Sequence, residues 1–189
     1  MAEPQPDAPR LEVGIIYAVL HTRSADWLDS MKHCHYSIAV ATSDTTVMRW
    51  HATNENAAWD NEVGALANVW EIVCKPYTCT ESRALVLLVV LGRMHADWSV
   101  EVLDGIFRQS PPLYVPEEDQ ERFPKFNCQS WFVNAVRLLA HHKGIWCPNP
   151  YDLLKNCADM CLEHERSVMA MESRYQIQLT PYSDTYRAP

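Results

Sequence analysis

The sequence predicts an α+β fold, because strand-forming runs dominate its first half and helical patterns dominate its second half. The chain has 189 residues, of which 48% are apolar and 21% are charged, and these values are typical of one globular domain with a sizeable core. We expect a disordered leader at residues 1–10, which contains three prolines, a single domain at 11–172 and a tail at 173–189.

Four runs of apolar and β-branched residues predict strands. They are Leu11–Leu20, His35–Ala41, Thr45–Ala52 and Ala84–Leu91. The second and third runs flank Ser43 and Asp44, a pair typical of a hairpin turn. The stretch Trp59–Val73 is ambiguous and has room for one more strand near its end.

Three later segments carry apolar residues at helical spacing. They are Trp98–Arg108, Cys128–His142 and Tyr151–Met171. The pattern is clearest in the second segment, where an apolar stripe runs from Trp131 to Leu139 and Gly144 follows the last turn. Four prolines and an acidic run predict a loop between the first and second helices, over Ser110–Lys125.

The predicted hairpin brings two histidines together. If Ser43 sits near the centre of the turn, His35 lies opposite His51, and cross-strand neighbours have Cβ atoms about 5 Å apart. One face then carries His35, Ser37, Arg49 and His51, and the other face is apolar. The apolar face consists of Tyr36, Ile38, Met48 and Trp50.

Cys128 opens the clearest helix. A helix N-terminus offers unsatisfied N–H groups and a partial positive charge, which favour the reactive thiolate, and a neighbouring imidazole favours it further. The sequence therefore supplies the parts of a Cys–His nucleophile pair. Backbone N–H groups at this helix start, together with Asn127 or Gln129, are candidates for stabilising an oxyanion.

Two segments in the order His–His–Cys carry a resemblance. They are HYSIAVATSDTTVMRWHATN and FNCQSWFVNAVRLL. They resemble the circularly permuted branch of the NlpC/P60 papain-like superfamily, which includes the lecithin:retinol acyltransferase-like proteins, and most of all a group of largely uncharacterised fungal proteins of that type. The likeness runs over roughly Leu11–Gly144 and depends on three short patterns: His35–Ile38, Arg49–Asn54 and Asn127–Val133.

The resemblance implies an antiparallel sheet packed against the cysteine-bearing helix. It also implies that Cys128 is the nucleophile, His35 the general base and His51 the third polar member. His33 competes with His35 for the base role, because alternation puts both on one face.

Three more residues are candidates for contacts with substrate: Arg49, Asn54 and Trp131. Their structural alternatives are a solvated arginine, a turn asparagine and a core tryptophan.

Charge and cysteine spacing limit the partners, the cell compartment and the cofactors that we expect. A net charge of −8 argues against nucleic acid as a partner, no run is long enough to span a membrane, and no signal peptide is visible. We therefore expect a cytoplasmic protein in which the seven cysteines are reduced thiols. No Cys-x-x-Cys pair or Gly-rich phosphate loop occurs, so we expect no metal and no cofactor. We interpret Cys74 and Cys79, and also Cys157 and Cys161 with His164 one turn further along a helix, as positions of buried or partly exposed thiols.

The leading functional expectation is a cysteine-dependent hydrolase or acyltransferase that acts on an amide or (thio)ester of a small molecule or peptide. A second possibility is a non-hydrolytic small-molecule-binding protein or cyclase, for which fungal secondary metabolism is a natural setting, that uses the histidines without the sulfur. A third is an interaction module that docks through the acidic loop Glu117–Glu121 and the C-terminal helix with its tail. The oligomeric state is left open.

Overall fold

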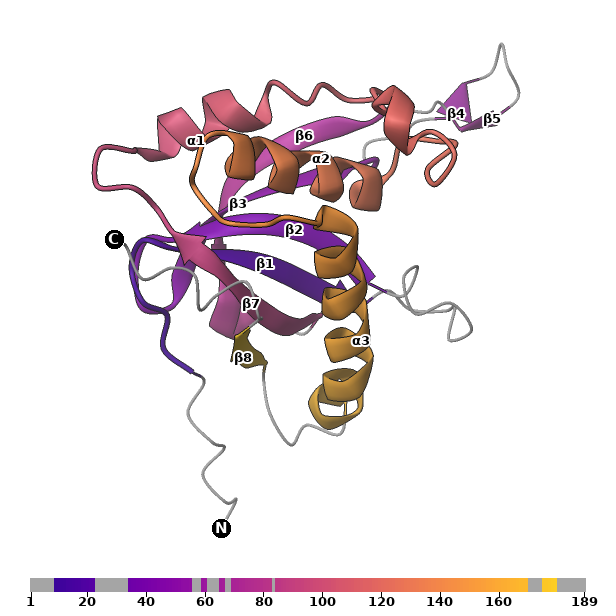
Figure 1. Cartoon of the computed structure of the whole chain (residues 1–189). Helices are drawn as coiled ribbons and strands as arrows, with labels where there is room; N and C mark the ends of the chain where they lie inside the picture. The colour runs from indigo at the N-terminus through magenta and orange to yellow at the C-terminus, as the bar shows by residue number, and fades with distance from the viewer. Residues whose placement is uncertain are drawn as a thin grey trace.

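A six-stranded sheet with helices packed against it forms the domain, and the predicted α+β class is confirmed (Figure 1). The computed structural model describes residues 9–22, 34–55, 59–60, 65–66, 69–82, 84–169 and 175–179. The strand order is β6-β3-β2-β1-β7-β8. The strands are β1 (Ile15–Thr22), β2 (Cys34–Ala41), β3 (Thr46–Thr53), β6 (Glu71–Thr78), β7 (Leu85–Arg93) and β8 (Gln176–Leu179).

The sheet is mixed rather than purely antiparallel. Across the sheet, each neighbouring pair from β6 through β3, β2 and β1 to β7 is antiparallel, but β8 runs parallel to β7. Strand β8 lies within the segment predicted as a tail, and Tyr175 just before it is buried. Burial of this side chain and pairing with a central apolar strand hold the segment in the sheet. A separate two-stranded ribbon consists of β4 (Trp59–Asp60) and β5 (Ala65–Leu66).

The β2–β3 hairpin has a different register from the predicted one. The recorded pairs run from Ala41 opposite Val47 to Ile38 opposite Trp50, so the centre lies at Asp44 and the register is shifted by two residues. An even shift leaves every side chain on its predicted face. His35 is therefore diagonal to His51 instead of directly opposite, and the predicted division into a polar and an apolar face is confirmed.

Helices α1 (Val100–Phe107), α2 (Cys128–His141) and α3 (Pro150–Met169) pack on one face of the sheet. Helix α2 lies over β2 and β3, and α3 contacts β1 and β7 (Figure 1). The ring of Phe132 lies 5.5 Å from that of Tyr36, centroid to centroid, and marks this interface. Short 3-10 turns occur at η1 (Cys79–Glu81) and η2 (Glu117–Asp119). None of the helices among the described residues is long and apolar enough to span a membrane.

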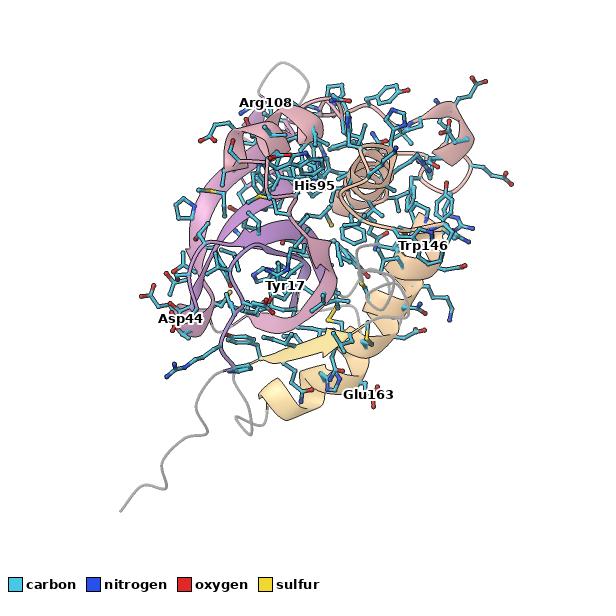
Figure 2. All side chains as sticks on the ribbon, turned by 60° about the vertical axis from the view of Figure 1, so that its left-hand side comes forward. Tyr17, Asp44, His95, Arg108, Trp146 and Glu163 are labelled. Carbon is cyan, nitrogen blue, oxygen red and sulfur yellow. A yellow bond between two sulfur atoms is a disulfide. The ribbon has the colours of Figure 1, made fainter. Side chains whose placement is uncertain are left out.

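The opposite face of the sheet encloses a second, smaller core. Tyr17, Val19, Ala39, Val47 and Leu88 belong to it. Figure 2 shows Tyr17 inside the ring that the curled sheet makes in that view. We call this side the concave face. Because both faces of the central strands are covered, β1 and β7 are nearly continuous apolar runs, which made them recognisable in the sequence.

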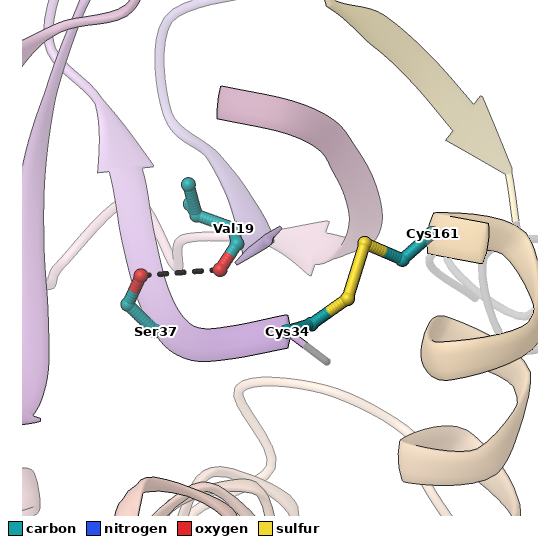
Figure 3. Close-up of a disulfide and its surroundings, with 4 residues drawn as sticks. All are labelled: Val19, Cys34, Ser37 and Cys161. Atoms are coloured by element: carbon teal, nitrogen blue, oxygen red, sulfur yellow. Dashed lines mark hydrogen bonds between the residues drawn. A yellow bond between two sulfur atoms is a disulfide. The ribbon is translucent and has the colours of Figure 1, made fainter. Parts of the chain in front are cut away.

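Cys34 at the start of β2 forms a disulfide with Cys161 of α3 (Figure 3). The expectation that all cysteines are reduced is therefore wrong for these two residues, which lie 127 positions apart. The other five cysteines form no disulfide. Figure 3 also shows the Ser37 hydroxyl donating to the carbonyl oxygen of Val19, at 3.1 Å, which ties β2 to β1 on the concave face.

Candidate functional site

His35 and His51 form a hydrogen-bonded pair. The distance from His35 Nε2 to His51 Nδ1 is 3.0 Å, and the two rings are nearly perpendicular, at 88°. His51 is buried, whereas His35 is half-buried. The pair therefore has an outer member that a substrate can approach and an inner member that orients it.

Three further polar side chains surround the pair on the concave face. Arg49 Nη2 lies 3.4 Å from His51 Nε2, and Arg49 Nη1 lies 3.2 Å from His21 Nε2. The Tyr77 hydroxyl is 2.8 Å from His21 Nε2, and the Arg49 guanidinium lies over the Tyr77 ring, 4.3 Å from its centre. We call His21, His35, Arg49, His51 and Tyr77 the histidine–arginine cluster. It draws residues from four adjacent strands: β1, β2, β3 and β6.

The arginine dictates where the protons lie. A guanidinium only donates, so both imidazole nitrogens that face Arg49 must accept. His51 then carries its proton on Nδ1 and donates it to His35 Nε2, and a neutral His35 keeps its own proton on Nδ1. By the same argument His21 carries its proton on Nδ1, since its Nε2 faces the Arg49 guanidinium and the Tyr77 hydroxyl, which share its single lone pair.

Both inner histidines are uncharged near neutral pH. Burial, followed by the charges of Arg49 and His51, lowers the pKa of His21 from 6.5 to about 3. Burial, Arg49 and Lys75 lower the pKa of His51 from 6.5 to about 3 as well. Desolvation penalises the imidazolium form, and a neighbouring guanidinium repels it.

Cys128 lies on the other face of the sheet from this cluster. Side chains alternate along a strand, and Tyr36 and Trp50 share the helical-side core with Cys128. Their chain neighbours His35 and His51 point to the concave face. The structure thus brings the two predicted histidines together but leaves the predicted nucleophile, which is buried, in a separate core. His33, the competing candidate for the base, lies outside the described residues.

The candidates next to Cys128 have structural tasks. The Asn127 side-chain oxygen accepts from the backbone N–H groups of Gln129 and Ser130, at 2.9 and 3.0 Å, and caps α2. Two of the N–H groups expected to serve an oxyanion are therefore already bonded. Gln129 is half-buried beside this cap. Trp131 is fully buried, with its ring 6.0 Å from that of Phe107, as expected of a core residue.

Two other expectations concern the hairpin. Arg49 is 8% exposed, so the expectation that its side chain is solvated is wrong. Asn54 follows β3 and is exposed, and among the described residues it joins none of the cluster's hydrogen bonds.

Sequence analysis missed His21 and Tyr77. The predicted first strand ended at Leu20, whereas β1 continues to Thr22 and pairs His21 directly with His35. Alternation from Tyr17 and Val19 would have put His21 on the concave face had the strand been extended by one residue. Tyr77 lies in β6, which was expected to end before it.

Two other thiols, one on each side of the sheet, are not activated. Burial raises the pKa of Cys79 on the concave face from 9.0 to about 12, although Arg49 opposes this effect, and burial raises the pKa of Cys147 on the helical side to about 11. Within the described part of the chain, no group of three or more His, Cys, Asp or Glu side chains is arranged to hold a metal ion. Arg49 explains why three histidines do not form such a site, since it occupies the acceptor nitrogens of two of them.

Comparisons with known proteins found no matching family model, no similar curated protein and no similar solved structure.

Proposed function

We propose that this chain is a histidine-dependent hydrolase or acyltransferase that acts on an amide or (thio)ester through His35. The observation that carries the proposal is the 3.0 Å hydrogen bond between His35 and the buried His51, which holds the ring of the more accessible histidine in one orientation. An oriented imidazole is a frequent catalytic group in acyl transfer, where it carries protons or donates a hydrogen bond to the developing oxyanion.

The proton arrangement supports a role for His35 as a hydrogen-bond donor. Because its Nε2 accepts from His51, a neutral His35 offers the N–H of Nδ1 to the substrate. This N–H bonds to the carbonyl oxygen and stabilises the negative charge that develops there as the nucleophile adds to the carbonyl carbon. The proton of the nucleophile passes to the leaving oxygen, nitrogen or sulfur as its bond to that carbon breaks, so the ring stays neutral throughout.

Water, or a hydroxyl or amine of a second substrate, is the nucleophile that suits this geometry. Cys128 and His35 belong to opposite faces of the sheet, so a direct Cys128–His35 ion pair does not fit this packing. With such a nucleophile the activity depends on the histidines and not on the sulfur.

A thiol nucleophile is the second candidate. It is supported by the position of Cys128 as the first residue of α2, within the capping box that Asn127 and Ser130 form, and by the resemblance of its surrounding motif. In that form an acyl-thioester on Cys128 would accumulate, and alkylation by iodoacetamide would select Cys128 at low pH. The burial of this thiol predicts slow alkylation instead.

The test is turnover of a panel of p-nitrophenyl esters and acyl thioesters by the full chain. We expect His35→Ala to lose about 100-fold or more of kcat/KM, and His51→Ala about 10-fold. His142→Ala, at an exposed histidine after α2, is the matched control and should keep full activity. Cys128→Ala and Cys128→Ser should retain activity if water or a co-substrate attacks, and should abolish it if the thiol does. Unchanged activity in His35→Ala would rule out both forms.

A further inference from the structure

Arg49 is a buried cation without a carboxylate partner in the described part of the chain. The residue is 8% exposed, and none of the ion pairs found among the described residues includes it. Burial lowers the pKa of its guanidinium, but the ordinary pKa of arginine is so far above 7 that the group stays charged at neutral pH. Burying a charge is unfavourable unless an opposite charge or strong acceptors compensate it.

Its neighbours compensate this charge only in part. His21 and His51 are neutral and supply one acceptor nitrogen each, and the Tyr77 ring covers one side of the guanidinium. The charge of Glu55, an exposed residue, raises the pKa of Arg49, but the two form none of the ion pairs found among the described residues. Lys75, directly across the β3–β6 pair from Arg49, adds another positive charge. The cluster therefore carries excess positive charge in a chain whose net charge is −8.

Two buried N–H donors of this cluster lack acceptors among the described residues. One is Nε of Arg49 and the other is Nδ1 of His21, the nitrogen that carries the His21 proton. A buried donor without an acceptor costs about 1–3 kcal/mol, and buried polar groups in proteins are nearly always satisfied. A carboxylate beside Arg49 supplies both an acceptor for its Nε–H and the opposite charge, whereas Nδ1 of His21 lies on the side of the imidazole ring away from Arg49 and needs an acceptor of its own.

We propose that Arg49 forms the binding site for the carboxylate group of a small-molecule ligand on the concave face. His35 and Tyr77, both half-buried, form the accessible rim of the cluster. The inference rests on the proposed function in one respect, since it names the substrate class as a carboxylate-bearing amide or ester that places its carbonyl beside His35. Arginine suits the task because its fork of N–H groups matches the two oxygens of a carboxylate.

The test is binding of sodium acetate and sodium hexanoate to the full chain, with sodium chloride at equal ionic strength as the reference. The Nε–H resonance of Arg49, assigned by its absence in Arg49→Lys, should shift on titration with either carboxylate. At ten times the dissociation constant the melting temperature should rise by about 3–6 °C. Arg49→Met should lose this ligand-dependent rise, whereas Arg108→Met, at an exposed arginine of another element, should keep it.

Each outcome decides the proposal. The resonance is read on the wild-type protein, so the test stands even where Arg49→Met folds poorly. A resonance that neither carboxylate moves, or an equal rise in melting temperature in Arg49→Met, would overturn the site. A response to inorganic phosphate alone would overturn the carboxylate assignment. Carboxylate binding is also measured on the His35→Ala variant, which is expected to be inactive. The carboxylate site is supported if this variant binds, even where the wild type shows no ester turnover and the proposed function fails.

Discussion

The guanidinium of Arg49 lies beneath the ring of Tyr77, so the edge strand β6 supplies the cover for the charge buried on β3. The same tyrosine bonds His21 through its hydroxyl, and the two contacts can be separated by mutation. We expect Tyr77→Phe, which keeps the ring, to lower the free energy of unfolding by about 1 kcal/mol. Tyr77→Leu should lower it by about 2–3 kcal/mol, because the cation–π contact is lost as well. Equal effects in urea denaturation would mean that the ring does not stabilise the cation.

The two inner histidines make stability depend on pH. The pKa values of His21 and His51 are lowered from 6.5 to about 3 on folding, so the unfolded chain binds more protons between these limits. Stability is therefore complete above pH 6.5 and declines as the pH falls toward 3. Each histidine should account for about 2 kcal/mol between roughly pH 6.5 and 4.5.

Urea denaturation over this pH range checks that slope. His21→Asn and His51→Asn should each reduce the slope, while His142→Ala, at an exposed histidine, should leave it unchanged. A slope that is the same in all three variants would show that other groups cause the acid sensitivity.

A buried carboxylate fixes the loop before α2. Asp119 is fully buried and accepts two hydrogen bonds from Arg137, both at 3.0 Å, and one from the Tyr151 hydroxyl. We expect Asp119→Ala to cost about 2–4 kcal/mol, because Arg137 loses its bidentate partner. Glu118→Ala is the matched control, since that carboxylate is exposed and 3.9 Å from Arg137, and it should cost less than about 0.5 kcal/mol.

Two glycines differ in the space around them. A Cβ atom at Gly144 would approach two ring atoms of Trp98 to 2.7 Å, whereas one at Gly105, within α1, meets nothing within 4 Å. We expect Gly144→Ala to destabilise the domain by about 1–3 kcal/mol. Gly105→Ala should stabilise it by about 0.5–1 kcal/mol, because alanine restricts the unfolded chain and favours the helix. Thermal unfolding of both variants tests the contrast, and a common sign of effect would contradict it.

The Cys34–Cys161 disulfide should stabilise the fold by closing a long loop. The two residues are 127 positions apart, and closure of such a loop is worth about 3–5 kcal/mol. We expect dithiothreitol to lower the urea midpoint of the wild type but not that of Cys161→Ser. Cys147→Ser, at a free cysteine, should respond like the wild type. Detection of all seven thiols in the denatured, unreduced protein would contradict the bond.

Local patterns were sufficient for much of the fold. The apolar run of β7 and the stripe of α2 were recognisable because a strand buried on both faces and an amphipathic helix leave short-range signatures. The α2 start at Cys128 was also predictable, because the helical pattern begins directly after Asn127, and the observed capping box supplies the physical reason for that start. The faces of His35 and His51 followed from strand alternation alone.

The candidate site was only half predictable. The His35–His51 contact is local to one hairpin, and an error of two residues in its register did not disturb it. The partnership of His21 with His35 depends on which strand lies next to β2, and no short-range pattern encodes that neighbour. The position of Cys128 relative to the histidines depended on which sheet face α2 covers, and this was assigned from a resemblance rather than from packing.

The sequence by itself determined the α+β class, the two faces of the hairpin, the contact between His35 and His51, and the helix that begins at Cys128. These features depend on residues close together in the chain, whose spacing matches the period of a strand or a helix. Only the tertiary structure decided the addition of β8, the Cys34–Cys161 bond and the enclosure of Arg49 beside His21. These features join distant segments, and their partners are selected by the burial of whole faces, which no local pattern records.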